Sequence, residues 1–441
     1  MASSSGRRSL DRPRPFARHG RLRRSRAVGA VFRTIAMAVA VVLVSTVAVA
    51  GVAVWRLSSS LTASTVHLEH ESGATAPPGI DAISGGVNLL LVGTDTRTGQ
   101  GSQFADRADL AASSGAGNND VTILLHIAQD HRSAMVVSFP RDLILNLPAC
   151  PSPKGGSYLP VTNAMLNSSL ARGGLACPVL TIEKLIPGLT IPYAASISFD
   201  GVAAMSNAVG GVTVCVATAI SDPYTGLFLP AGEHTIQGDV ALAFVRTRHG
   251  VGDGSDLGRI SNQQVFLSAL ARKVESEGVL KNPIEVYSLA QAATQHMQLS
   301  DTLAHLDTMA SIALALKSVP LDNIVMVQYP TGSNANFPNR VVPVTSDAAV
   351  NRALVDDEAV TLTGSTGRGS IVDTHPTAEA TPTPTAAPTG ENGKPLPAKE
   401  KGELAHTPAS TAPPVPTTAL PSTVTGQTAA QQTCSKGQKG G

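Results

Sequence analysis

The sequence predicts an α/β (α+β) domain with a central mixed β-sheet flanked by helices, preceded by a transmembrane helix and followed by a disordered tail. Three observations predict this organisation. Compact apolar runs alternate with helix-spaced apolar residues over residues 85–350. A charge-free run of twenty residues, 35–54, precedes them. Residues 361–441 are rich in Pro, Thr, Ala, Ser and Gly, a composition that buries too little apolar surface to fold.

The N-terminal residues 1–34 form a basic segment with ten arginines and one acidic residue, Asp11. The apolar run that follows, closed by Trp55, is long enough to cross a hydrocarbon core of ~30 Å, so residues 35–55 are predicted to be a transmembrane helix. The arginines predict a cytoplasmic N-terminus and an extracellular main domain in a single-pass protein of the cell membrane. The basic block has no interleaved aromatic residues, which argues against a nucleic-acid partner.

A cleaved signal peptide is the alternative interpretation of this region, because Ala48-Val49-Ala50 resembles a cleavage site. The basic leader and the apolar run are both longer than a signal peptide requires, so an uncleaved anchor is favoured. Residues 56–84 are then a short stalk that ends in turn-rich sequence.

Three predicted strands follow the stalk, at residues 87–92, 121–127 and 135–139. Each is bounded by charged residues, which are Asp95, Arg97, Asp120, Arg141 and Asp142. A single such residue is most simply a turn or cap residue. Ligand sites in α/β sheets gather at strand ends, so recurrence at three strand ends predicts one shared site for an anionic ligand.

Residues 241–264 bring Arg246, Arg248 and Arg259 close together in the sequence. If the chain is extended there, Arg246 and Arg248 leave the same face. Helical spacing from Ile260 onward puts Arg259 near the start of a helix. Converging guanidinium groups suit a multiply charged anion. The alternative is that these arginines pair with nearby aspartates (Asp239, Asp253 and Asp256) on a solvated surface.

The remaining elements are predicted from periodicity. Residues 161–211 show helical spacing broken by Gly-Gly and Pro-Gly. Within and just beyond this range, residues 196–216 predict a strand, a helix, a Gly-Gly turn and a second strand. Residues 284–317 predict two helices, and residues 324–327 predict a closing strand.

The four cysteines are Cys150, Cys177, Cys215 and Cys434. Their spacing, without a histidine cluster, argues against a structural zinc site. Disulfides are possible in an exported protein, and Cys150 with Cys177 is the favoured pair because both lie in Pro/Gly-rich loop sequence. Cys215 has the pattern of a buried strand residue, although its bonding to another cysteine stays open.

Five motifs together resemble the LytR-CpsA-Psr (LCP) family over most of residues 85–330: NLLLVGTDTR, DVTILLHI, VVSFPRDL, GGVTVCV and ALAFVRTRHG with its downstream GSDLGRI and QQ. The order and spacing of the motifs match, and the high Ala, Gly, Pro and Arg content is typical of an actinobacterial source. The basic leader, single span and external domain also fit that family.

The resemblance implies a phosphotransferase of cell-wall biogenesis. Such an enzyme moves a glycopolymer such as teichoic acid from a polyprenyl-pyrophosphate lipid onto peptidoglycan, with pyrophosphatase chemistry as a possible side activity. Asp95 and Asp120 correspond to the residues that bind Mg²⁺ (or Mn²⁺). The pyrophosphate-binding positions correspond to Arg97, Arg141, Arg246, Arg248, Arg259 and Gln263. The catalytic set is both aspartates with Arg141, Arg246, Arg248 and Arg259.

The chain also departs from the family pattern. Asn118 and Asn262 stand where an arginine is usual, and Val161 stands at a usual lysine. These lost cations leave room for a non-catalytic, membrane-anchored binder of the lipid or wall polymer. A transcriptional regulator is the third hypothesis, but no helix-turn-helix pattern supports it. An apolar groove for the lipid is expected among the helices of 160–210 and 260–320.

Overall fold

The computed structural model divides the chain into two compact units, Met1–Arg56 and Leu57–Gly441. The structure describes residues 32–41, 44–45, 51–52, 59, 65–68, 85–96, 117–152, 155–276, 282–373 and 415–438. In the first unit, residues 32–41 are helical and exposed. Among the described residues, none of the helices combines the length and the apolar character needed to cross a bilayer. Residues 42–43, 46–50 and 53–55 of the predicted span and most of the predicted stalk lie outside the described residues.

The second unit is built on an eight-stranded mixed sheet, which confirms the predicted fold class. In sheet order its strands are β1 (Thr65–Val66), β14 (Met297–Ser300), β9 (Tyr193–Ile197), β2 (Val87–Thr94), β3 (Asn119–Ile127), β4 (Ala134–Phe139), β15 (Ile324–Gln328) and β21 (Gly426–Thr428). Strands β2, β3 and β4 form an antiparallel meander. Strand β9 joins β2 and strand β15 joins β4 in parallel.

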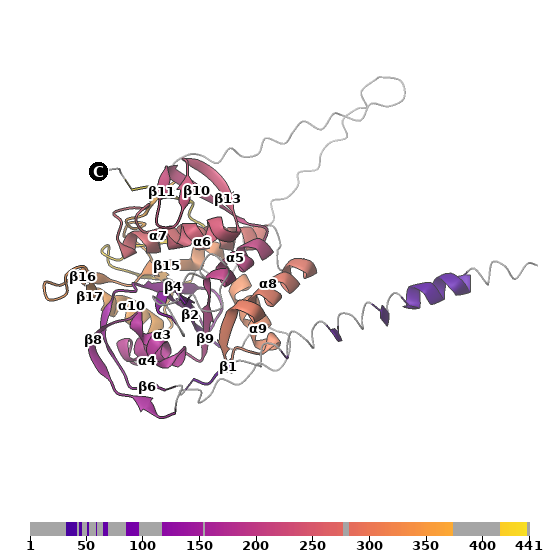
Figure 1. Cartoon of the computed structure of the whole chain (residues 1–441), viewed down its shortest axis with the longest axis horizontal. Coiled ribbons are helices and arrows are strands. Elements are labelled where there is room, and N and C mark those ends of the chain that lie inside the picture. The colour runs from indigo at the N-terminus through magenta and orange to yellow at the C-terminus, as the bar shows by residue number, and fades with distance from the viewer. Residues whose placement is uncertain are drawn as a thin grey trace, which may run out of the picture. The chain divides into compact units, whose positions relative to one another are not determined.

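Eight α-helices are described in this unit, and several cover the two faces of the sheet (Figure 1). They are α3 (Ser168–Gly173), α4 (Ala176–Leu185), α5 (Phe199–Ala208), α6 (Gly238–Arg246), α7 (Asp256–Ser276), α8 (Pro283–His296), α9 (Leu306–Ser318) and α10 (Asp347–Val355). Residues of α3, α4 and α10 pack in the core on one face, and residues of α9 pack in the core on the other.

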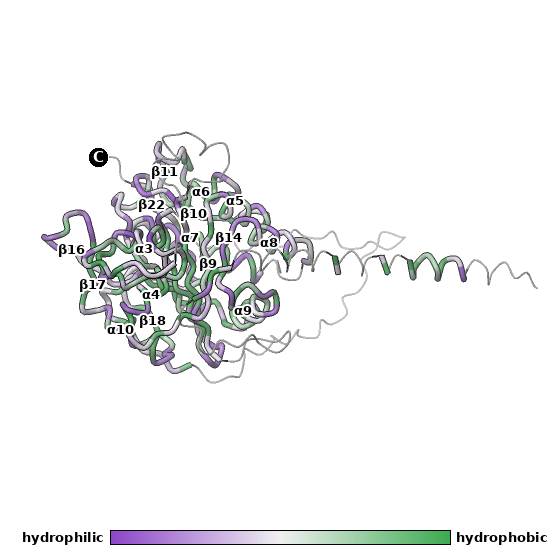
Figure 2. The backbone as a smooth tube through the Cα atoms, turned by 60° about the horizontal axis from the view of Figure 1, so that its bottom comes forward, coloured by the Kyte–Doolittle hydropathy of each residue, from purple (hydrophilic) through white to green (hydrophobic). Residues whose placement is uncertain are grey.

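Side chains of β2 point alternately to the two faces of the sheet, and both faces are covered by a hydrophobic core. Leu90 and Val92 point into the first core, and Leu89 points into the second. A strand that is buried on both faces reads as a continuous apolar run, which is why these strands could be predicted from sequence. Figure 2 shows hydrophobic colour along the central strands and more hydrophilic colour on outer segments such as β16 (Thr331–Ser333).

A second, four-stranded sheet lies on the other side of α7 (Figure 1). Its strands in order are β13 (Gly232–Ile236), β10 (Val212–Thr218), β22 (Thr433–Lys436) and β19 (Ser370–Val372). Helix α7 contacts β10, β19 and β22 of this sheet and β15 and β21 of the large sheet. This position between two sheets buries polar as well as apolar residues of α7.

The remaining described strands form two-stranded ribbons. They are β5 (Ile144–Leu147) with β8 (Val161–Met165), β6 (Cys150–Pro151) with β7 (Ser157–Tyr158), β11 (Ile220–Asp222) with β12 (Leu227–Leu229), β16 with β17 (Val341–Pro343), and β18 (Val360–Thr361) with β20 (Thr418–Ala419). The helical spacing expected from residue 161 is therefore wrong for β8, because the hydrogen bonds to β5 and the β-branched Val161 and Thr162 favour a strand.

One further expectation is corrected. The run before Arg246 is helix α6 rather than extended chain, with Ala241, Leu242 and Phe244 buried on one side. Periodicity cannot distinguish a short apolar strand from a short buried helix. The strand predicted over residues 324–327 is confirmed as β15, which also has β21 as a neighbour.

The prediction of a disordered tail over 361–441 is wrong for its described residues. Strands β19, β21 and β22 belong to the two large sheets, and β20 pairs with β18. The small polar side chains of these strands bury little apolar surface, but backbone pairing and a disulfide hold the strands in place. Residues 374–414 and 439–441 lie outside the described part.

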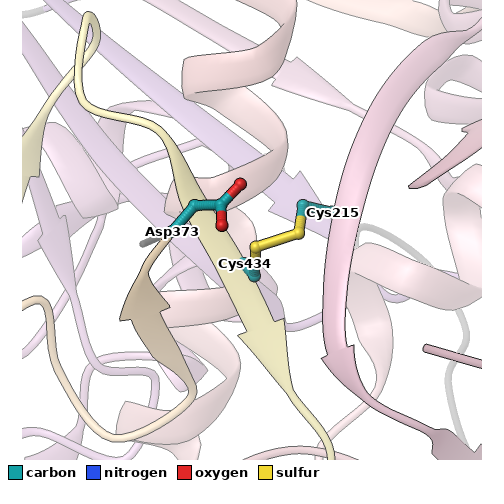
Figure 3. A group of neighbouring side chains, drawn as sticks. All are labelled: Cys215, Asp373 and Cys434. Atoms are coloured by element: carbon teal, nitrogen blue, oxygen red, sulfur yellow. A yellow bond between two sulfur atoms is a disulfide. The ribbon is translucent and has the colours of Figure 1, made fainter. Parts of the chain in front are cut away.

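All four cysteines are paired. The favoured Cys150–Cys177 disulfide is present. Cys215 is bonded to Cys434, 219 residues away, and this bond joins neighbouring strands β10 and β22 (Figure 3). Asp373 lies beside these two cysteines. Both sulfur atoms are used by the disulfide, so the three residues offer no thiolate pair to a metal.

A buried histidine anchors the end of β3 that lies away from Asp120. His126 Nε2 is 3.1 Å from Asp357 Oδ1, and its Nδ1 is 2.7 Å from Asn88 Oδ1. Burial alone would raise the pKa of Asp357, but hydrogen bonds from His126 and the Gln129 N–H hold that pKa below its ordinary value. A carboxyl with a lowered pKa stabilises the fold above about pH 4 and loses this contribution as pH falls through its folded pKa.

We therefore expect Asp357→Asn to lower the free energy of unfolding at pH 7 by at most about 1 kcal/mol, because the carboxylate is partly exposed. At pH 3 the difference from the wild type should shrink, because the wild-type carboxyl is then increasingly protonated. Urea denaturation at the two pH values measures both differences. An equal loss at pH 3 and pH 7 would show that shape, rather than charge, explains the effect.

Candidate active site

The three charged strand ends meet at one edge of the large sheet. Because β2, β3 and β4 are antiparallel neighbours, the end of β2, the start of β3 and the end of β4 lie together. A pocket of about 230 Å³ opens at this edge. Its polar lining includes four arginines and two aspartates, which are Arg141, Arg246, Arg248, Arg259, Asp120 and Asp222. The sequence predicted five of these six.

Asp120 occupies a β-bulge. Thr94 pairs with Asn119 and Gly93 pairs with Val121, so Asp120 has no partner of its own on β2. A bulge turns a side chain away from the regular alternation and is common beside active sites. The Asp120 Oδ1 atom lies 2.8 Å from Arg141 Nη1, and the Arg259 guanidinium donates to the Asp120 carbonyl oxygen. One backbone irregularity thus holds two arginines of the pocket.

Asp256, at the first position of α7, connects the same two arginines from behind. Its carboxylate is almost fully buried. Oδ2 accepts the backbone N–H of Arg141 at 3.0 Å, and Oδ1 lies 2.7 Å from Arg259 Nη2 and 3.7 Å from Arg141 Nε. Burial alone would lower the pKa of Arg141, but the charges of Asp120 and Asp256 raise it above its ordinary value. Arg141 therefore stays a cation in this pocket.

The sequence pointed to Asp256 only as a possible surface partner of the arginines. Its position three residues before Arg259 in a helix was the available signal, because that spacing places two side chains on one face. Its contact with Arg141 joins residues 115 apart in the chain and could not be read from spacing.

Arg248 is held at the pocket by the residues around it. The preceding Thr247 donates its hydroxyl to Asp222 Oδ2 at 2.5 Å, and Asp222 also accepts the Tyr224 N–H. Burial lowers the pKa of Arg248, and the nearby charges of Arg141 and Arg259 lower it further. Its Nε atom is buried and has no hydrogen-bond partner among the described residues. An anion in the pocket would relieve this repulsion.

Arg246 ends helix α6, and its guanidinium lies 3.9 Å from the centre of the Phe199 ring. The ring face attracts the cation and fixes its place at the wall of the pocket. Phe199 begins helix α5, and apolar residues continue this wall: Val121, Ile197, Val202, Leu242 and Val245. Of the helices expected to form an apolar groove, α5 contributes to this pocket, and no residue of α8 or α9 lines it; the apolar residues of α6 come from outside the expected ranges.

The other predicted site residues have different positions. Asp95 does not line the pocket; its carboxylate accepts the Asn118 N–H at 2.5 Å and the Asn118 side-chain amide at 3.2 Å. Gln263 is buried and donates to the Val245 carbonyl at 2.9 Å, which holds α7 against α6. Arg97 lies outside the described residues.

Asp120 and Asp95 are the residues of this edge that could hold a divalent cation. Both offer carboxylate oxygens, which are the protein ligands that Mg²⁺ and Mn²⁺ prefer, and Mg²⁺ commonly uses only one or two carboxylates beside phosphate oxygens and water. The type of donor atom therefore suits such an ion, while Asp95 itself lies outside the pocket lining. Binding would require Asp95 to share its oxygens with Asn118 and Asp120 to share Oδ1 with Arg141.

A model of the LytR_cpsA_psr family matches residues 54–352. Cell wall biosynthesis protein LcpA of Corynebacterium glutamicum is 30% identical over 275 residues, which are 57% of this chain and 51% of that protein. Polyisoprenyl-teichoic acid–peptidoglycan teichoic acid transferase TagT of Bacillus subtilis is 30% identical over 205 residues, which are 45% of this chain and 55% of that protein.

The chain spans about half the length of the curated relatives it matches. A solved LytR-Csp2A-Psr enzyme from Actinomyces oris aligns with a TM-score of 0.47 at 20% identity, covering 66% of this chain and 95% of the other. The family match ends at residue 352, before strands β18 to β22.

Proposed function

The chain belongs to the LytR_cpsA_psr family, and from that premise we propose that it is a phosphotransferase of cell-wall assembly. Its substrate would be a glycopolymer linked through pyrophosphate to a polyprenyl lipid, and its acceptor a hydroxyl group of peptidoglycan. The attacking oxygen forms a bond to the phosphorus next to the polymer. The bond between that phosphorus and the bridging oxygen breaks, and polyprenyl phosphate leaves. With water as the acceptor, the same step would give pyrophosphatase activity.

The observation that carries the proposal is the cluster of arginines around one pocket. Arg141 and Arg259 lie close enough to Arg248 that their charges lower its pKa. A pyrophosphate group carries several negative oxygens, and the planar fork of arginine matches them. In phosphoryl transfer the protein contributes mainly positioning and charge neutralisation. These arginines supply both, and Asp120 and Asp256 fix their orientation before substrate arrives.

The apolar wall of the pocket offers a binding surface for the lipid that is attached to the pyrophosphate. Val202, Leu242 and Val245 lie on the same pocket as the arginines. The first isoprene units of the carrier would pack against this wall, with Arg246 over Phe199 at the junction of charged and apolar lining. A membrane-anchored chain with its main domain on the outer side, as the first 56 residues predict, would meet such a lipid at the bilayer surface.

A divalent cation belongs to this proposal. Asp120 and Asp95 would hold Mg²⁺ or Mn²⁺ at the edge of the pocket, and the bound ion would neutralise charge on the phosphate oxygens. The chain's own contribution is then to place the reacting phosphate. Arg141 and Arg259 orient its oxygens, and a carboxylate close to the acceptor accepts the hydroxyl proton.

A second candidate is a non-catalytic module that binds the lipid-linked polymer. The engagement of both Asp95 carboxylate oxygens with Asn118, away from the pocket, favours it. Such a module needs the arginines but not the aspartates as metal ligands.

The deciding experiment incubates the purified full chain with a synthetic polyprenyl-pyrophosphate-linked sugar and peptidoglycan fragments, with and without Mg²⁺. Release of polyprenyl phosphate together with sugar on the acceptor would establish transfer. Lipid that is bound but unchanged in the presence of both Mg²⁺ and acceptor would establish the binding module instead.

We expect Asp120→Asn to reduce the rate of release on the order of 100-fold, because the metal ion loses a ligand and Arg141 loses its ion-pair partner, and both stabilise charge at the reacting phosphate. The variant should also bind Mn²⁺ more weakly, as followed by the electron paramagnetic resonance of the free ion. Asp239→Asn, an exposed acidic residue of α6, is the matched control and should leave both measurements unchanged. Wild-type rate and Mn²⁺ affinity in Asp120→Asn would remove Asp120 from the proposed centre.

A further inference from the structure

The C-terminal segment 415–438, called here the C-terminal strap, returns to the middle of the folded unit. It supplies the last strand of the large sheet, β21, and an interior strand of the second sheet, β22. The family match ends at residue 352. The strap is therefore an addition to the matched region, and its contacts fall on the elements that carry the arginines.

The strap holds the loop between α6 and α7 by its backbone. This arginine loop, residues 247–255, contains Arg248 and leads directly into the turn of α7 that carries Arg259. The Gly252 N–H donates to the Lys436 carbonyl at 2.9 Å, and the Gln438 N–H donates to the Gly250 carbonyl at 2.9 Å. Val251 and Gly437 form an antiparallel bridge between these two bonds. The loop is thus paired as a short extra strand along the end of the strap.

Side chains extend this contact to both helices of the site. Ser435 Oγ donates to Asn262 Oδ1 at 2.5 Å, and Asn262 donates in turn to the Phe244 carbonyl. Asn262 is fully buried on α7, and Phe244 lies two residues before Arg246 in α6. A single polar chain therefore links the strap, the helix of Arg259 and the helix that ends at Arg246.

Further contacts fasten the strap along the rest of α7. Gln427 donates to the Gln264 carbonyl and to Ser268, and Arg272 donates to the Ala429 and Gln431 carbonyls. The Cys215–Cys434 disulfide ties β22 covalently to β10 (Figure 3). The strap also has little room to move at its end, because a Cβ on Gly437 would lie 2.0 Å from the Ala219 carbonyl oxygen.

We propose that the C-terminal strap is a positioning element of the anion site, which holds Arg248 and Arg259 in place for pyrophosphate and is itself fixed by the Cys215–Cys434 disulfide. This role rests on the proposed function of the pocket. The physical reason is repulsion: three partly buried guanidinium groups face one pocket, and a free loop would move Arg248 outward into water. Restraining the loop keeps the binding-competent arrangement populated before the anion arrives.

Affinity for inorganic pyrophosphate, measured by calorimetry on the full chain, tests the proposal. The variants are Gly437→Ala, which displaces the strap beside the arginine loop, and the double change Cys215→Ser with Cys434→Ser. If the competent arrangement falls to about a tenth of the population, Kd rises about tenfold. The matched control removes the other disulfide, by Cys150→Ser with Cys177→Ser. It should lower Tm and leave Kd unchanged, because neither cysteine belongs to the strap, to its partner strand β10 or to the arginine loop.

Hydrogen exchange at the Gly252 amide gives a second measurement, because that amide donates to the strap. Both strap variants should speed its exchange relative to the wild type and the control. Variants whose Tm falls while their Kd for pyrophosphate stays at the wild-type value would overturn the proposal. The strap would then contribute to stability only. A wild type that does not bind pyrophosphate would instead overturn the proposed function, and the positioning role with it.

Discussion

Arg141→Ala should reduce transfer from a polyprenyl-pyrophosphate donor by about 10²–10³-fold, the range seen when one preorganised charge-stabilising donor is removed from an active site. Arg141 contacts both carboxylates that organise the pocket, Asp120 from β3 and Asp256 from α7. Its raised pKa keeps it charged at every pH at which the enzyme would work. Its loss removes a cation from the phosphate and leaves Asp120 Oδ1 without its guanidinium partner.

Arg141→Lys separates charge from geometry. Lysine keeps the positive charge but is a single point donor and cannot present a planar fork to two oxygens. We expect its rate to lie between those of wild type and Arg141→Ala, with kcat affected more than KM if Arg141 acts mainly in the transition state. The assay is release of polyprenyl phosphate, with circular dichroism as the check on folding. Near-wild-type turnover in Arg141→Ala would place the reacting phosphate elsewhere.

The central strands could be predicted from sequence because they are buried on both faces. Strands β2, β3 and β4 read as apolar runs, and their charged ends were correctly expected at one edge. The antiparallel order that brings those ends together could not be read from the runs themselves. The same is true of the bulge at Asp120, which depends on how β3 pairs with β2.

The order of the strap could not be predicted from its composition. Most of its residues are small or polar, and composition alone predicts disorder for such a segment. Two of its few aliphatic residues, Leu420 and Val424, are nevertheless buried in the core. Order comes from backbone pairing with β10, β15 and β19 and from a disulfide to a residue more than 200 positions away. These partners are distant in sequence, so no local sequence pattern predicts the pairing. Cys434 is a local sign, because a cysteine that forms a disulfide ties its segment to the folded part of the chain.

The sequence predicted the charged residues that line the pocket. It did not predict Asp256 as a site residue, because Asp256 acts on the pocket by holding Arg141 and Arg259. Four arginines and Asp120 line the pocket as expected. Asn262 stands where the family pattern has a cation, and its position explains the difference: it is fully buried between Phe244 and Ser435, out of the pocket. Asn262 therefore helps the strap to pack against α7. Because its side chain is not part of the pocket lining, its lack of charge does not change the charge of that lining.

Asp256→Asn should have the largest effect on stability, lowering the free energy of unfolding by about 3 kcal/mol. Removing one member of a buried ion pair typically costs about 3–5 kcal/mol, because the remaining charge stays in the interior without compensation. Here the remaining charge is Arg259, whose side chain is only 4% exposed. Asparagine keeps the size and one acceptor for the Arg141 N–H, so the lost quantity is chiefly the negative charge.

Asp253→Asn is the matched control, because Asp253 lies three residues earlier and also pairs with an arginine. Its partner is Arg368, and both side chains are largely exposed, at 41% and 58%, so the expected loss is below about 1 kcal/mol. Urea denaturation of the two variants compares the same charge change in buried and solvated settings. Pyrophosphate should raise the stability of folded Asp256→Asn, because the anion supplies the negative charge that Arg259 has lost. Equal losses in the two variants would mean that Asp256 does not organise the site, and the orientation of Arg141 and Arg259 would then have to come from Asp120 alone.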